Sequence, residues 1–283
     1  MTKDEIWEEL KRDETKIYGQ ILFDVFVQTT DDLTLKHFME LDKELRNKIN
    51  SGSVYSILIK SIKEGVDVFQ KVLDELEQEN IDKLTGHNVY KLFSVFLGMH
   101  TGINLDLLGE LPDIIGKSLG HNINKLDHNE IWSLLSASRH TNRSIEKMSD
   151  ILGRENINKL TSGEIFHILN HSSLNAESRK IRADILGPKL IERLDNNHII
   201  EFLLSGDKDK ADILGENINR LSGYDIYKLL KNSGKEWTTS QAISRKENII
   251  NILGPKNMNK LREKYKKELG LVRTDPKLLR GGL

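Results

Sequence analysis

The chain contains no cysteine, only four prolines and few aromatic residues. Without cysteine, neither disulfide bonds nor zinc–thiolate sites can form, and the redox environment of the protein is left unconstrained. Hydrophobic residues make up 37%, aromatic residues 6% and charged residues 30% of the 283 positions. This composition is typical of a thin helical array, in which each part buries an apolar face only against its neighbours.

The sequence also lacks long apolar runs and the short motifs that mark common active sites. No apolar run approaches the ~20 residues that a membrane-spanning helix needs. Residues 1–9 are too charged for a signal peptide, so we expect a cytoplasmic protein without a membrane partner. No P-loop, nucleophile elbow or Gly-rich dinucleotide fingerprint is present. We therefore expect a non-enzymatic protein with no cofactor.

A short segment recurs along most of the chain, and its clearest copy is Leu-Gly-Arg-Glu-Asn-Ile-Asn-Lys-Leu-Thr at residues 152–161. When the copies are aligned on the last leucine, the steps between them range from 27 to 42 residues. Self-similarity at this period predicts stacked helical repeats. The aligned anchor residues are Ile49, Leu84, Leu126, Leu160, Leu194, Leu221 and Leu261.

Each repeat predicts two helices. After the anchor comes a capping residue such as Thr161, with an acid such as Glu164 three positions later, which together predict a capping box. Apolar residues at helical spacing then predict a first helix of two to three turns. A second helix ends at a glycine such as Gly153, which suits a position with positive φ. Six or seven residues lead from this glycine to the next anchor.

We therefore expect an all-α fold, a right-handed α-solenoid of about six short helical-hairpin repeats that spans residues 48–261. Residues 1–47 are predicted to form a helical N-terminal cap, with helices at residues 6–25 and 34–48, because the end of a solenoid must cover an exposed apolar face. Residues 262–283 are predicted to form a basic C-terminal helix and tail. In the first repeat, which lacks the glycine, the second helix is predicted to continue to Glu79.

The residue before each anchor is basic in every repeat, and this basic column has two interpretations. Regularly spaced cations suit a polyphosphate backbone, which makes the column a candidate nucleic-acid contact. The structural alternative is that each cation satisfies late carbonyl groups of its own second helix. The candidate contact residues are Lys83, Lys125, Lys159, Arg193, Arg220 and Lys260, and Lys48 occupies the same place at the start of the array.

Two further columns allow both a binding and a structural interpretation. Asparagines that flank the connector isoleucine, such as Asn156 and Asn158, could hold a polar ligand, and the structural alternative is bonding to connector backbone groups. An aromatic column in the first helices suits stacking of single-stranded nucleic acid, or packing between repeats. The aromatic column consists of Tyr55, Tyr90, Trp132, Phe166 and Tyr227, and Ile200 interrupts it.

Three other features are candidates for contacts. The hairpin loops vary most at residues 95–111 and 232–248, and Trp237 in the second loop is a candidate contact with a protein partner. His167 and His171 have the spacing of metal ligands on a helix, but no third ligand is evident and no metal site is expected. Residues 255–283 hold nine Lys or Arg against three Asp or Glu, although the whole chain has a net charge of −1.

The repeats at residues 48–261 resemble those of helical-repeat α-solenoids such as the HEAT and TAL-effector families. Leu160-Thr161 followed by Ile165 and Ile168, with a step of 34 residues to the next anchor, is similar to the start of a TAL-effector repeat. That resemblance implies a right-handed superhelix that reads one DNA base per repeat. The chain departs from the family's pattern because its period varies and no regular base-reading dipeptide lies between the helices.

From these patterns we expect a binding scaffold whose extended helical surface holds a protein partner. The alternative is a solenoid that binds nucleic acid through the basic column and the basic C-terminal tail. An enzyme built from the inserted loops is a third, less supported alternative. The sequence does not identify the partner or the oligomeric state.

Overall fold

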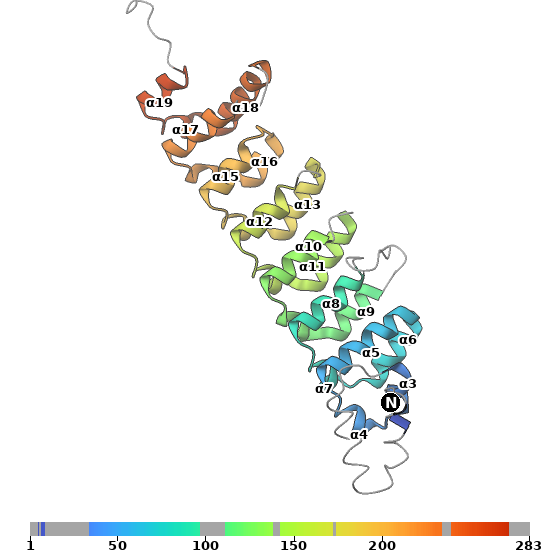
Figure 1. The fold of residues 1–283 in the computed structure, drawn as a ribbon. Coiled ribbons are helices and arrows are strands. Elements are labelled where there is room, and N and C mark those ends of the chain that lie inside the picture. The colour runs from blue at the N-terminus through green and yellow to red at the C-terminus, as the bar shows by residue number, and fades with distance from the viewer. Residues whose placement is uncertain are drawn as a thin grey trace, which may run out of the picture. The chain divides into compact units, whose positions relative to one another are not determined.

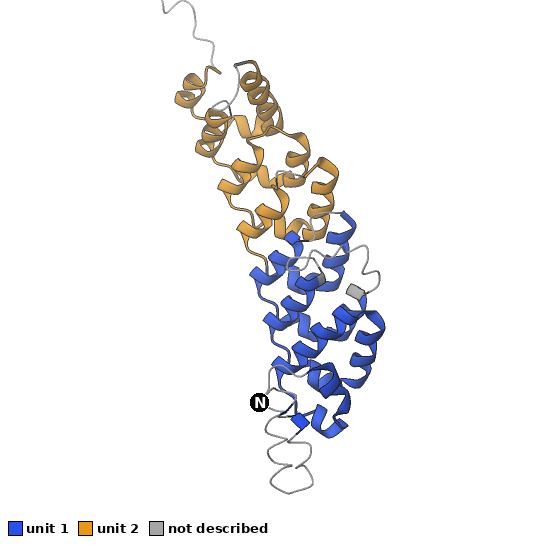
Figure 2. Ribbon diagram, turned by 45° about the vertical axis from the view of Figure 1, so that its right-hand side comes forward, with its two compact units in different colours: residues 1–159 blue, residues 160–283 orange. Residues whose placement is uncertain are grey.

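The computed structural model describes residues 5, 7–8, 34–96, 111–137, 142–171, 174–233 and 239–271. Within these residues every regular element is a helix, which confirms the all-α prediction for this part of the chain (Figure 1). None of these helices combines the length and the apolar character needed to cross a bilayer. The chain divides into two compact units, residues 1–159 and residues 160–283 (Figure 2).

Unit 1 contains two short helices and then three helical pairs. The first helices of these pairs contact one another in chain order, α5 with α8 and α8 with α10, and among the second helices α9 contacts α11. The short helices are α3 (Leu35–Glu40) and α4 (Lys43–Arg46). The pairs are α5 (Ser51–Glu64) with α6 (Val66–Glu75), α8 (Gly86–Phe96) with α9 (Leu111–Leu119), and α10 (His128–Ala137) with α11 (Asn142–Ile157). The connectors are α7 (Gln78–Ile81) and the 3-10 helix η2 (Gly120–Lys125).

Unit 2 repeats this arrangement with three more pairs. Here α15 contacts α12 and α17, and α16 contacts α13 and α18. The pairs are α12 (Ser162–Leu169) with α13 (Ala176–Leu186), α15 (Asn196–Leu203) with α16 (Lys208–Leu214), and α17 (Gly223–Asn232) with α18 (Thr239–Met258). The connectors are α14 (Pro188–Ile191) and the 3-10 helix η4 (Gly215–Arg220), and α19 (Glu263–Glu268) follows the last pair.

The first helices begin where the sequence predicts. Thr161 and Glu164 form a reciprocal capping box at the start of α12, and Ser222 and Asp225 form another at the start of α17. In each box the cap oxygen accepts a hydrogen bond from a backbone N–H that has no partner within the helix, and the acid accepts one from the cap residue. The capping residue therefore determines where each repeat turns into its first helix.

The core of each unit consists of the apolar stripes of successive pairs. All seven anchor residues are buried, with at most 3% of their surface exposed. The apolar residues of the first helices are equally covered, as with Ile165 and Leu169 of α12, each 0% exposed. Burial of a leucine or isoleucine side chain contributes roughly 1.5–3 kcal/mol. The pairs are thus held together mainly by apolar contact with their neighbours.

The glycines that end the second helices adopt the predicted positive φ. Gly153 has φ 72° and ψ 162°, and Gly254 has φ 64° and ψ 175°. This region is essentially accessible to glycine alone. After each of these glycines the connector forms one further helical turn, which the sequence analysis did not predict.

Three predicted boundaries are wrong. The helix predicted at residues 34–48 is two helices, because Asp42 accepts a hydrogen bond from the backbone N–H of Leu45 and caps a new helix. The second helix of the first repeat ends at Glu75, where Leu76 turns extended, and a separate helix starts at Gln78. Residues 239–248, predicted as part of a variable loop, belong to α18.

The two ends of the array are described only in part. The predicted helix at residues 6–25 lies outside the described residues except for residues 7 and 8. Trp7 is completely buried, with its ring stacked on His37 of α3 at a centroid distance of 4.3 Å. The charged helix predicted at the C-terminal end is present as α19. Residues 272–283 lie outside the described residues.

Candidate functional site

The ends of the second helices carry a recurring Asp-Ile-Leu-Gly segment, which was interpreted from the sequence only as a helix end. In α11 the segment is Asp150-Ile151-Leu152-Gly153, and copies follow in α13 and α16. In each copy the leucine is buried, the isoleucine is half-buried and the aspartate is exposed. Successive residues of a helix point about 100° apart, so every copy directs one apolar and one acidic side chain outward.

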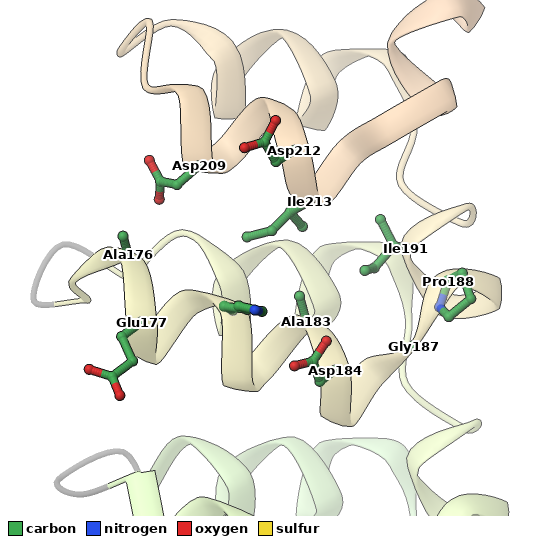
Figure 3. Close-up of a pocket in the computed structure, with 11 residues that line it drawn as sticks. Ala176, Glu177, Ala183, Asp184, Gly187, Pro188, Ile191, Asp209, Asp212 and Ile213 are labelled. Carbon is green, nitrogen blue, oxygen red and sulfur yellow. The ribbon is translucent and has the colours of Figure 1, made fainter.

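A groove of about 720 Å³ lies between α13 and α16 in unit 2 (Figure 3). Its apolar surface comes from small and aliphatic side chains, Ala183 on α13, Ile191 on α14 and Ile213 on α16. Figure 3 shows Ile213 reaching from α16 into the space beside α13. Because alanine occupies position 183, the side chain there is too small to close the space between the two helices.

The rim of this groove is acidic. Four carboxylates line it, and Lys180 is the cation among the residues that line it. Asp184 and Asp212 come from the recurring segment and are exposed. An open apolar surface edged by carboxylates favours cationic groups on chains that also carry aliphatic side chains. The four carboxylates belong to Glu177, Asp184, Asp209 and Asp212.

Unit 1 has a corresponding groove of about 560 Å³ between α9 and α11. It is lined by Asp113 and Ile114 of α9 and by Asp150 and Ile151 of α11. Asp113 is paired with Lys147 at 2.9 Å, so this rim is less acidic than that of the groove in unit 2. Here Gly116 lets the helices approach, because a Cβ atom at this position would lie 3.0 Å from the Cγ2 of Ile151.

Behind the groove of unit 2, charged residues occupy positions that are apolar in other repeats. Lys210 is only 9% exposed, whereas Met148 and Ile249 hold the corresponding place in α11 and α18. Its Nζ donates to the Oδ1 of Asn170 at 3.2 Å and lies 5.3 Å from the ring centre of Phe202. Burial lowers the pKa of Lys210. The guanidinium of Arg179 pairs with Asp209 on the neighbouring helix.

The basic column binds backbone carbonyls of the preceding connector. Lys125 Nζ donates to the carbonyl oxygens of Asp82 at 2.6 Å and Leu84 at 2.8 Å. Lys83, Lys159 and Lys260 make the same pair of bonds one repeat on from their acceptors. The structural alternative predicted this kind of bond but placed it on the lysine's own helix, which is wrong. A charged donor at the end of a helical turn stabilises that turn through its dipole.

The two arginines of the column differ in what the structure shows. Arg220 donates from Nη1 to the carbonyl oxygen of Glu192 at 2.6 Å. Arg193 lies in the turn after α14 and is exposed. The lysine ammonium groups are directed to internal acceptors, and no contact in the described residues favours their use on a phosphate. Contact of this column with nucleic acid therefore stays a prediction.

The asparagines form a second set of bonds between connectors. The side-chain Nδ2 of Asn156 donates to the Oδ1 of Asn124 at 2.8 Å and to the carbonyl oxygen of Leu152 at 2.8 Å. Asn257 makes the equivalent bonds to Asn219 and Leu253, at 3.0 and 2.9 Å. Asn156 and Asn257 are 1% and 4% exposed, so these amides face neighbouring connectors and not solvent.

The aromatic column packs between repeats. Phe166 of α12 stacks on His198 of α15 at a centroid distance of 4.8 Å, and Tyr227 of α17 stacks on Tyr265 of α19 at 4.5 Å. None of the five aromatic residues is classed as exposed. Trp237, the predicted partner contact, lies outside the described residues. Among the described residues, no group of three or more His, Asp or Glu is placed to hold a metal ion.

Comparison of the chain with protein-family models, with curated protein sequences and with solved structures gives no match. The function must therefore be inferred from the residues themselves.

Proposed function

We propose that the chain is a non-enzymatic binding scaffold, an α-solenoid of about six helical-hairpin repeats whose second helices hold a protein partner. The groove between α13 and α16 is the observation that carries this proposal. It combines about 720 Å³ of open space with apolar side chains and an acidic rim on two rigid helices. A concave apolar surface with a few polar groups is the usual form of a binding site. A cytoplasmic location remains a prediction.

The contents of the groove favour binding over catalysis. Its titratable groups are four carboxylates and Lys180, with no histidine or serine among the lining residues. Asp209 is paired with Arg179, which leaves the exposed Asp184 and Asp212 as the carboxylates best placed to meet a ligand. Rim carboxylates of this kind give a partner's cationic groups orientation and a fast association rate, while Ile191 and Ile213 contribute apolar contact.

The test is affinity capture with matched variants. The full chain is immobilised, retained proteins are identified from a cell extract, and the affinity of each purified partner is measured by isothermal titration calorimetry. We expect the double variant Asp184→Asn/Asp212→Asn to weaken binding several-fold, since each rim charge contributes roughly 0.2–1 kcal/mol. Ile213→Ala should weaken it further, because the apolar contact is lost.

The matched control is Glu192→Gln/Glu201→Gln, which removes two exposed carboxylates of unit 2 that do not line the groove. This control should bind as the unmodified chain does. The proposal is wrong if no protein is retained saturably, or if the groove variants and the control bind with equal affinity.

A further inference from the structure

Three tyrosines gather on α17 and α19, away from the groove residues. Tyr227 stacks on Tyr265 at a centroid distance of 4.5 Å and an interplanar angle of 21°. Tyr224 lies 6.2 Å from each of the other two rings, at angles of 25° to Tyr227 and 44° to Tyr265. Tyr227 is buried, whereas Tyr224 is 51% exposed. The cluster therefore has a packed base and one ring that is open to solvent.

Each ring of this tyrosine cluster has a lysine against it. The Nζ atoms of Lys228, Lys231 and Lys264 lie 4.7, 5.1 and 4.8 Å from the ring centres of Tyr224, Tyr227 and Tyr265, respectively. Together α17 and α19 carry five lysines and three carboxylates. Lys231 is partly neutralised, because its Nζ lies 3.1 Å from Glu268. The surface around the open ring of Tyr224 is thus cationic overall.

An equivalent contact one step earlier in unit 2 separates structural need from excess. Phe166 and His198 hold the same repeat positions as Tyr227 and Tyr265, and they stack with nearly the same geometry, 4.8 Å and 24°. There, the positions of Tyr224, Lys228 and Lys264 are taken by Gly163, His167 and Asn197. Packing between helical pairs therefore requires neither the exposed ring nor the lysines.

We propose that Tyr224, Lys228, Lys231 and Lys264 form a binding site for single-stranded nucleic acid, with a base stacked on Tyr224 and the lysines at the flanking phosphates. Every base presents a flat π-face, so stacking on an exposed aromatic ring tolerates any sequence. Lysines around the ring add the electrostatic attraction that dominates the affinity for nucleic acid. The site is separate from the groove and does not depend on the proposed protein partner.

The test is fluorescence anisotropy with fluorescein-labelled oligothymidine and oligouridine of about 12 nucleotides, within the range that one small binding surface covers. We expect saturable binding of the full chain that weakens between about 50 and about 200 mM salt, with a slope of roughly −0.7 per phosphate contacted. Comparing the two oligonucleotides shows whether DNA or RNA is preferred. Tyr224→Ala should weaken binding about tenfold, in the range found for a stacked base.

Three variants keep the interpretation sharp. Tyr224→Phe retains the ring and should bind like the unmodified chain. Lys228→Gln/Lys264→Gln should lower the salt slope by about 1.4, because two phosphate contacts are lost. Tyr90→Ala is the control, since Tyr90 and His87 in unit 1 stack at 6.2 Å and 25°, as Tyr224 and Tyr227 do, but no lysine is recorded over Tyr90. That control should leave the affinity unchanged.

Two results would overturn the proposal. One is no saturable binding of either oligonucleotide at about 50 mM salt. The other is binding that Tyr224→Ala does not weaken, because the basic column or another cationic surface would then be responsible. Tyr224 is half-exposed, so circular dichroism should show an intact fold in its variants. Failure of this site leaves the groove proposal untouched, since the groove is tested with different residues and a protein ligand.

Discussion

Lys260 Nζ donates to the carbonyl oxygen of Asn219 at 2.6 Å, and this bond ties one connector to the connector before it. The same ammonium group donates to the carbonyl oxygen of Leu221 at 3.1 Å. A carbonyl at the end of a helical turn has no partner within that turn, so the lysine of the next repeat supplies one. This bond gives a physical reason for a cation before every anchor.

Lys83→Met should lower the free energy of unfolding by about 2 kcal/mol. Lys83 Nζ donates to the carbonyl oxygens of Asn47 and Ile49 and to the Oδ1 of Asn80. Removing a charged donor leaves part-buried acceptors without a partner, which costs roughly 1–3 kcal/mol. Urea unfolding followed by circular dichroism measures the change.

The control for this variant is Lys63→Met on α5, where the side chain is exposed. Its effect should lie within about 0.5 kcal/mol of zero, as for most surface substitutions. If both variants unfold at the same urea concentration, the carbonyl bonds of Lys83 contribute nothing measurable.

The sequence predicted the helical elements well where local chemistry determines them. Capping pairs such as Thr161 with Glu164 and terminal glycines such as Gly153 act within a few residues, so their pattern is visible in the chain. The acceptors of the basic column were placed wrongly because they lie 28 to 43 residues away. A column of identical residues shows that a contact is repeated, but not which repeat provides the partner.

The candidate groove was missed for a related reason. Asp184 and Asp212 are exposed, and Ile213 is half-buried, but their sequence pattern is that of any amphipathic helix end. The space between α13 and α16 exists because residue 183 is alanine, and that depends on the packing of two helices. The recurring aspartate before the Ile-Leu-Gly segment was the available signal, since a helix end alone does not require an acid there.

Asn219→Ala and Asn257→Ala should be coupled in a double-mutant cycle by about 1 kcal/mol. Asn257 Nδ2 donates to the Oδ1 of Asn219 at 3.0 Å, and Asn257 is 4% exposed. A net contribution near 1 kcal/mol is usual for a hydrogen bond within a protein, and residues in direct contact are not additive. Urea unfolding of the four proteins in the cycle gives the coupling free energy. Strict additivity would show that the connectors gain no stability from this bond.

Gly223→Ala should destabilise the chain by about 1–3 kcal/mol, because overpacking forces the backbone apart. A Cβ atom on Gly223 would lie 2.1 Å from the carbonyl oxygen of Lys260, which cannot move without breaking the connector. Gly163→Ala is the matched change, since nothing lies within 4 Å of a Cβ atom there and the residue is in α12. That change should stabilise by about 0.4–1 kcal/mol. Equal thermal midpoints for the two variants would contradict the close approach at Gly223.

Lys210→Met should raise the free energy of unfolding at pH 7 by about 1 kcal/mol, because replacing a buried charge with a packed apolar side chain is often stabilising. Met148 already fills the equivalent position in α11. Burial lowers the pKa of Lys210, so the unfolded chain binds more protons between the folded pKa and 10.5. The unmodified protein must therefore gain stability from this group as pH rises through that window. The advantage of the variant should shrink when urea unfolding is repeated at about pH 10. The exposed Lys208→Met should show no such dependence. A stability difference that stays constant between the two pH values would mean that Lys210 is not strained by burial.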